Sequence, residues 1–253
     1  MNIIVCVKAV KSSLVSPAKS GDEEIMINPY DLYALKDVLR LKASKNITII
    51  CLGMGPKNAE SVMIKCLAMG ADHAVLLCDP AFGGADTVAT TYALQSAIKK
   101  IDENALIVCG GQSIDGETGQ VVFGIAERLK RMCITNVKNI METGEDYIIL
   151  DTVSTDFIKK IRVKTPVVIS YCDFITAREN ISLLNLKKAK KKGVELINAE
   201  QLGVDVNKCG VNGSRTKVLN ICAVQPERKD NVVYVHGTSN EKAALIHGLL
   251  TKQ

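Results

Sequence analysis

The sequence contains no tryptophan, and its few tyrosines and phenylalanines make up only 4% of 253 residues. Proteins that bind single-stranded nucleic acids stack bases on aromatic side chains, so this composition argues against that class. A membrane-spanning helix is also excluded, because no run of about eighteen apolar residues occurs. The net charge of +5, from 32 basic and 27 acidic residues, is too small to indicate nucleic-acid binding by itself.

Several motifs of common enzyme and cofactor sites are also missing. The chain has neither the G-x-G-x-x-G dinucleotide fingerprint, nor the G-x-x-x-x-G-K-[ST] phosphate loop, nor the H-E-x-x-H zinc motif. None of its three histidines stands beside a plausible nucleophile. We therefore expect no catalytic side chains and no metal site, so any redox chemistry would need a bound cofactor.

The nine cysteines are odd in number, form no C-x-x-C pair and fall mostly within apolar runs. That placement is typical of buried thiols that act as small hydrophobic side chains, not of a disulfide scaffold or a zinc site. Reduced thiols in this number indicate a reducing compartment, and we expect the protein to be cytoplasmic. The first residues predict a strand, not a signal peptide, since they have neither a basic region nor a cleavage site of small residues.

Short apolar runs alternate with amphipathic segments in the first half of the chain. The runs at 3–7, 47–52, 73–77 and 106–109 are rich in isoleucine, valine and leucine and lack the polar alternation of a strand with one face in water. Between them, apolar residues recur at helical spacing. This alternation predicts a doubly wound, mostly parallel α/β sheet of Rossmann-like type.

The pattern changes after residue 136. β-like runs at 137–142, 147–154, 157–163 and 166–171 predict a β-hairpin insertion near 137–163, followed by a last core strand. A lysine-rich segment then ends at residue 192, and the rest holds scattered turns and one expected helix at 240–250. We therefore expect an α/β domain over 1–192 and a C-terminal arm over 193–253. The arm is too short for a core of its own and is expected to pack on the domain or on another subunit.

Ligands of open α/β sheets bind beyond the carboxyl ends of the strands, where loops lead into helices. Three loops at that edge contain glycine, at residues 52–56, 82–87 and 110–120. Glycine lets backbone amides approach a ligand, and the helix starts that follow favour a phosphate group. One such loop alone is weak support for binding, but three at one sheet edge predict a ligand cleft.

Seven stretches, in the same order along the chain, resemble the β subunit of electron transfer flavoproteins, above all the electron-bifurcating branch of anaerobic bacteria. They are IVCVK at 4–8, NPYDLYAL at 28–35, GMGP at 53–56, LAMGAD at 67–72, GADTVAT at 84–90, QSIDGETGQV at 112–121 and LLNLKKAKKK at 183–192. The resemblance covers most of residues 1–205. It implies a domain of adenine-nucleotide-binding type whose cleft holds FAD in the bifurcating branch, or AMP in the simple one.

The resemblance also implies which residues contact the nucleotide. By motif position they are Cys6, Asn28, Pro29, Tyr30, Asp31, Met54, Asp86, Thr87, Thr90, Asp115, Gly116, Glu117, Thr118, Gly119, Gln120 and Val121. Leu183 matches the leucine of a recognition loop, near 178–192, that docks a partner dehydrogenase.

The activity that the resemblance implies is electron transfer within an oxidoreductase complex. With an α subunit, on which the arm would pack, the chain would move electrons between NAD(H), ferredoxin and a flavin-dependent dehydrogenase of acyl-CoA or 2-hydroxy-acid type. Two other hypotheses stay open: a simple carrier or structural subunit that holds AMP, and an unrelated adenine-nucleotide-binding enzyme such as an ATP pyrophosphatase. The turn after the first strand, at residues 6–10, has no glycine, which counts against the enzyme.

Overall fold

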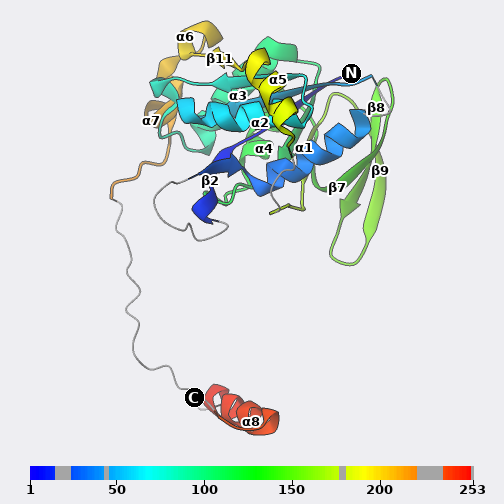
Figure 1. Cartoon of the computed structure of the whole chain (residues 1–253), viewed down its shortest axis with the longest axis vertical. Helices are drawn as coiled ribbons and strands as arrows, with labels where there is room; N and C mark the ends of the chain where they lie inside the picture. Colours follow the sequence, from blue (N-terminus) through cyan, green and yellow to red (C-terminus); the bar gives the residue numbers. More distant parts are fainter. Residues whose placement is uncertain (15–23, 43–45, 177–180, 221–235, 252–253) are drawn as a thin grey trace. The chain divides into compact units, whose positions relative to one another are not determined.

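The computed structural model describes residues 1–14, 24–42, 46–176, 181–220 and 236–251. The chain forms two compact units, Met1–Lys217 and Val218–Gln253. The first unit is an α/β domain in which helices cover both faces of one large sheet, and it carries the site described below (Figure 1).

The sheet has nine strands within the described residues. They are β1 (Asn2–Cys6), β4 (Thr48–Met54), β5 (His73–Leu77), β6 (Leu106–Gly110), β7 (Cys133–Thr143), β8 (Tyr147–Val153), β9 (Ile158–Lys164), β10 (Val168–Tyr171) and β11 (Glu195–Ile197). Their order is β11-β5-β4-β1-β6-β10-β7-β8-β9. Every pair from β11 to β7 is parallel, and β8 and β9 are antiparallel. The strand order reverses at β1, whose neighbours are β4 and β6.

Two apolar clusters, one on each face of the sheet, form the core. Helices α1 (Pro29–Lys42), α2 (Glu60–Met69) and α5 (Leu183–Lys192) pack on one face, where the cluster includes Ile3 and Val5 of β1. Helices α3 (Thr87–Asp102), α4 (Val121–Leu129) and α6 (Ala199–Leu202) pack on the other, with Ile4 of the same strand (Figure 1). Since both faces are buried, the central strands need continuous apolar runs. The doubly wound, mostly parallel fold predicted from the sequence is confirmed.

The antiparallel strands also agree with the sequence pattern. Strands β7, β8 and β9 form the expected hairpin extension at one edge of the sheet, and β10 returns to the core between β6 and β7. The small sheet of β2 (Ala9–Lys11) and β3 (Ile25–Ile27) was not predicted, because strands of three residues are too short for a readable period.

The α/β unit continues past Lys192, where the sequence placed the start of an arm. Strand β11 pairs in parallel with β5, and α6 contributes Ala199 and Leu202 to the core. The short helices η4 (Val206–Lys208) and α7 (Gly210–Gly213) follow within the same unit, which ends at Lys217. Each of these elements has only three or four residues, so none shows a period in the sequence.

The second unit contains α8 (Ser239–Leu250), close to the expected helix at 240–250. The Thr238 side chain caps the first turn of α8 together with Glu241. Leu245, Ile246, Leu249 and Leu250 leave large apolar side chains exposed on this helix. Among the described residues, no helix is both long and apolar enough to cross a membrane.

Candidate functional site

A cavity of about 1160 Å³ lies at the carboxyl edge of the sheet. The residues that follow β1, β4, β5 and β6 all line it, so it sits where the strand order reverses. Open α/β folds bind their ligands at this position. Leu52, Phe82, Leu94 and Val122 give the cavity apolar walls, and backbone from the glycine-containing loops gives it polar ones.

Two polar side chains at the start of α1 hold the loops of this cleft in place. Asn28 donates from Nδ2 to the Gln112 carbonyl at 2.8 Å, and its Oδ1 accepts from the Ile114 amide at 3.2 Å. The Asp31 carboxylate accepts from the amides of Lys8, at 2.8 Å, and Gly110, at 3.2 Å. The ends of β1 and β6 are therefore joined through α1.

Burial dominates the electrostatics of Asp31. Removal from water raises the pKa of its carboxyl to about 7, although the hydrogen bonds from Lys8, Asn28 and Gly110 and the charge of Lys8 all act to lower it. The Asp31 carboxyl, at the base of the cleft, therefore changes its protonation state near neutral pH.

The raised pKa predicts a pH effect on stability. Between about pH 4 and 7 the unfolded chain releases the Asp31 proton while the folded chain keeps it, so the free energy of unfolding falls as pH rises. The stabilisation that Asp31 contributes is fully present below pH 3.8, the pKa of this carboxyl in the unfolded chain, and is lost as pH rises through 7. It amounts to on the order of 4 kcal/mol at most. We expect the difference in free energy of unfolding between wild type and Asp31→Asn, measured by urea unfolding at several pH values, to shrink as pH rises. A constant difference would mean that the carboxyl is ionised throughout.

The Lys8 side chain contacts two residues of the loop that follows β6. Its Nζ lies 2.7 Å from the Asp115 carboxylate and donates to Ser113 Oγ at 3.4 Å. Burial alone would raise the pKa of Asp115, but the hydrogen bonds from Lys8 and Ser113 hold it below its usual value. Both charged groups are partly in water, so this ion pair orients the loop more than it stabilises the fold.

The two helices that begin at the cleft differ in their first turns. Asp86 precedes α3 and accepts from the amides of Val88 and Ala89, at 2.9 and 3.0 Å. None of the described side chains caps the start of α4, which follows the Gly119 turn. The first amides of a helix attract anions. The start of α4 is therefore the better place in this cleft for a phosphate group, because Asp86 already occupies the start of α3.

Asp86 also anchors a distant segment of the chain. Its Oδ2 accepts from the amides of Arg215 and Thr216, at 2.7 and 3.0 Å, and from the Thr216 hydroxyl. Its own amide donates to Ser214 Oγ at 2.8 Å. Burial would raise the pKa of Asp86, but these donors, with Ala89, lower it to about 2. The carboxylate thus fixes Thr216 as part of the cleft wall.

Two buried thiols lie side by side on the floor of the cleft, at the ends of β1 and β6. The hydrogen bond with Cys6, followed by burial, raises the pKa of the Cys109 thiol well above its usual value. That thiol is therefore protonated at neutral pH. The described cysteines form no disulfide. Within the described ranges, no group of three or more histidine, cysteine, aspartate or glutamate side chains is placed to hold a metal ion.

The structure brings most of the residues expected to contact a ligand into one place. The cavity is lined by Cys6, Asn28, Asp31, Met54, Asp86, Thr87, Thr90, Gly116, Thr118, Gly119 and Val121. Five others lie nearby without lining it: Pro29, Tyr30, Asp115, Glu117 and Gln120. Tyr30 accepts a hydrogen bond from Gln112, and Asp115 faces Lys8.

Some lining residues were not among those expected. Lys8 belongs to the IVCVK motif at residues 4–8, but the sequence analysis did not predict that its side chain lines the cleft. Thr216 has no such signal, because a contact with Asp86 across so much chain depends on the whole fold. Leu183 lies away from the cleft as the first residue of α5, with its side chain 79% exposed. The expected recognition loop also includes residues 178–180, which lie outside the described residues.

Comparisons with known proteins agree with this architecture. Residues 20–202 match the model of the electron transfer flavoprotein domain. The chain is 36% identical to the electron transfer flavoprotein subunit beta of Thermoanaerobacterium thermosaccharolyticum, over 97% of this chain and 95% of that protein. Protein FixA of Azotobacter vinelandii is 35% identical, over 90% and 86%. The caffeyl-CoA reductase-Etf complex subunit CarD of Acetobacterium woodii is 33% identical, over 96% and 95%. The chain therefore belongs to the electron transfer flavoprotein family, among its β subunits, and takes part in electron transfer.

Proposed function

We propose that this chain pairs with an α subunit and holds FAD in the cleft at the carboxyl edge of its sheet. In this proposal the pair moves electrons between NAD(H), ferredoxin and a flavin-dependent dehydrogenase by electron bifurcation. The observation that carries the proposal is the pairing of a large cavity with the uncapped start of α4.

The cleft fits a nucleotide in both size and chemistry. Its volume of about 1160 Å³ slightly exceeds the usual range of small-molecule sites, which supports a dinucleotide over a mononucleotide. Apolar walls suit a planar ring, and the turn from Gly116 to Val121 would hold phosphate oxygens by backbone amides and the Thr118 hydroxyl. Bound FAD would supply the exchange of one or two electrons. The chain's own residues would bind it, orient it and exclude water.

Counting flavins in the purified heterodimer tests this proposal. We expect an absorption spectrum that corresponds to two flavins per heterodimer, one of them in this chain. One flavin together with bound AMP would support the alternative, a simple carrier in which this cleft holds a structural nucleotide. A complex without any flavin would contradict both hypotheses.

Partner surfaces are part of the same proposal. The exposed apolar side chains of α8 support packing of the C-terminal arm on an α subunit. The name of the Acetobacterium relative places that protein in a complex with a caffeyl-CoA reductase. This supports a dehydrogenase of acyl-CoA type as the partner of the present chain, with a 2-hydroxy-acid dehydrogenase as the other possibility.

Leu183 is our candidate for the contact with that dehydrogenase. It directly follows Ser182, whose hydroxyl accepts from the Asn185 amide at 3.1 Å and caps α5, so the exposed leucine stands on a fixed helix start. We expect Leu183→Ala to slow electron transfer to the dehydrogenase about tenfold, since an apolar anchor contributes about 1–2 kcal/mol at an interface. Steady-state transfer rates measure this effect.

The control for Leu183→Ala is Met132→Ala, which shortens another exposed apolar side chain, 62% accessible, elsewhere on the surface. Flavin content should stay unchanged in both variants. If Leu183→Ala transfers electrons at the wild-type rate, docking does not depend on this leucine.

A further inference from the structure

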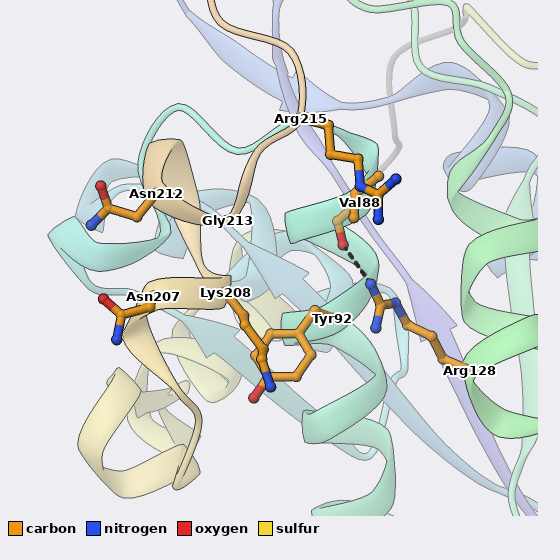
Figure 2. A pocket seen from close by; sticks show the side chains of 8 residues that line it. All are labelled: Val88, Tyr92, Arg128, Asn207, Lys208, Asn212, Gly213 and Arg215. Atoms are coloured by element: carbon orange, nitrogen blue, oxygen red, sulfur yellow. Dashed lines mark hydrogen bonds between the residues drawn. The ribbon is translucent and has the colours of Figure 1, made fainter.

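A second, smaller pocket lies between α3, α4, η4 and α7 and shares no lining residue with the cleft (Figure 2). Its volume is about 220 Å³. Three cationic side chains line it, each from a different part of the fold: Arg128 from α4, Lys208 from η4 and Arg215 from the segment after α7. None of the described residues that line the pocket is acidic.

Arg128 is fixed in place before any ligand arrives. Its Nε donates to Thr91 Oγ1 and its Nη2 to the Val88 carbonyl, both at 3.1 Å. The guanidinium also lies 5.6 Å from the centre of the Tyr92 ring. Figure 2 shows the guanidinium directed at Val88 across the pocket. A guanidinium has five N–H groups, so Arg128 keeps donors for a ligand at little cost in conformational entropy.

A hydrogen bond holds the backbone of Arg215 in place, while its guanidinium group is available to a ligand. Its amide donates to Asp86 Oδ2 at 2.7 Å, which sets the position of the residue. Its guanidinium makes no hydrogen bond or ion pair with any residue that the structure describes. In the view of Figure 2 this guanidinium overlaps Val88, which lines the same pocket.

Lys208 adds a third positive charge, which a neighbouring carboxylate neutralises only weakly. Its ammonium lies 3.7 Å from the Asp205 carboxylate, and both side chains are exposed. Tyr92 next to it accepts from the Asp205 amide at 3.1 Å, which leaves the phenolic proton for donation. The charged groups that line the pocket are therefore all donors, and they come from three different elements.

We propose that this pocket binds a phosphate group. A carboxylate is planar and is satisfied by one arginine, whereas a phosphate presents tetrahedrally arranged oxygens and up to two negative charges. Three cations from separate elements, with the amides of Asn207 and Asn212 at the rim, match the phosphate better. The site is separate from the nucleotide cleft, so it does not depend on the function proposed above.

Crystals soaked in tungstate provide the first test, because this tetrahedral dianion replaces phosphate and scatters anomalously. We expect an anomalous peak in the pocket, between the guanidinium groups of Arg128 and Arg215. The same soak of Arg215→Gln should show no peak there. An empty pocket in soaked wild-type crystals would overturn the proposal.

Binding in solution provides the second test. Inorganic phosphate, added to the full chain at constant ionic strength, should shift the Nε–H NMR signals of Arg128 and Arg215. These signals report on the pocket itself, so phosphate bound in the cleft is not counted. Glycerol phosphate, added in the same way, distinguishes a phosphorylated metabolite from free phosphate as the natural source.

Charge-matched variants make this test specific. Arg215→Gln and Lys208→Gln should each weaken phosphate binding about tenfold or more. Lys188→Gln, which removes one charge from an exposed position on α5, should leave the affinity within about twofold. Equal weakening in all three variants would indicate a general charge effect and no phosphate site. Since Lys208 and Arg215 are both exposed, loss of folding is not expected to obscure the result.

Discussion

Gly110→Ala should both destabilise the fold and empty the cleft of the nucleotide that we propose it holds. A Cβ at this position would overlap the Asp31 carboxylate and approach the Tyr30 Cβ to 2.7 Å and the Asp31 amide to 2.8 Å. The start of α1 would have to move away from β6, which breaks the hydrogen bonds that Asp31 makes to both loops. We expect the free energy of unfolding to fall by about 3 kcal/mol and bound nucleotide per folded chain to decrease. Urea unfolding and nucleotide extraction measure the two effects.

Gly116→Ala is the matched control for this change, because Gly116 lines the same cleft and belongs to the same loop. A Cβ there would meet only Ser113 Oγ, at an ordinary contact distance of 3.5 Å. We expect its stability to change by no more than about 1 kcal/mol. If Gly110→Ala were as stable as Gly116→Ala, α1 would not be the support of the cleft.

The central fold was predictable from the sequence because the central strands β1, β4, β5 and β6 are buried on both faces. Strands β1, β4, β5 and β6 appear as continuous apolar runs, and the helices between them show a helical period. The hairpin strands β8 and β9 were predicted from turn residues and β-like composition. Elements of three or four residues, such as β11, carry no period and were found only in the structure.

The candidate site was predictable in location but not in detail. Loops at the carboxyl edge of the sheet identify the cleft, because that edge is set by topology alone. Asp86, directly before an expected helix, is a natural N-cap, and the structure confirms that its side chain caps α3. The sequence could not show that none of the described side chains caps the start of α4. That difference between the two helix starts depends on where the side chains of the loop before α4 point, which only the packed structure determines.

A substitution of Asp86 should have the second large effect on stability, because its carboxylate makes two separate sets of hydrogen bonds. It caps α3 through Oδ1, and through Oδ2 it holds the segment that contains Arg215 and Thr216. Asp86→Ala removes both interactions, and we expect a loss of about 3 kcal/mol in the free energy of unfolding, combining a lost helix cap with lost charge-assisted hydrogen bonds. Asp86→Ser keeps a capping hydroxyl, so it should lose less stability while still releasing the segment.

Limited digestion with trypsin separates the two tasks of Asp86, because the protease cuts after arginine and a docked segment resists it. Cleavage after Arg215 should become faster in both Asp86→Ala and Asp86→Ser, and bound nucleotide should decrease in both, since Thr216 leaves the cleft wall. Asp205→Ser changes the cap of η4 without touching this segment, so its cleavage rate after Arg215 should stay near wild type. The wild-type protein should also lose stability as pH falls from about 4 toward 2, where the Asp86 carboxylate takes up its proton, and Asp86→Ser should lose less. A segment equally protected in Asp86→Ser and wild type would show that the Asp86 carboxylate is not the anchor of the cleft wall.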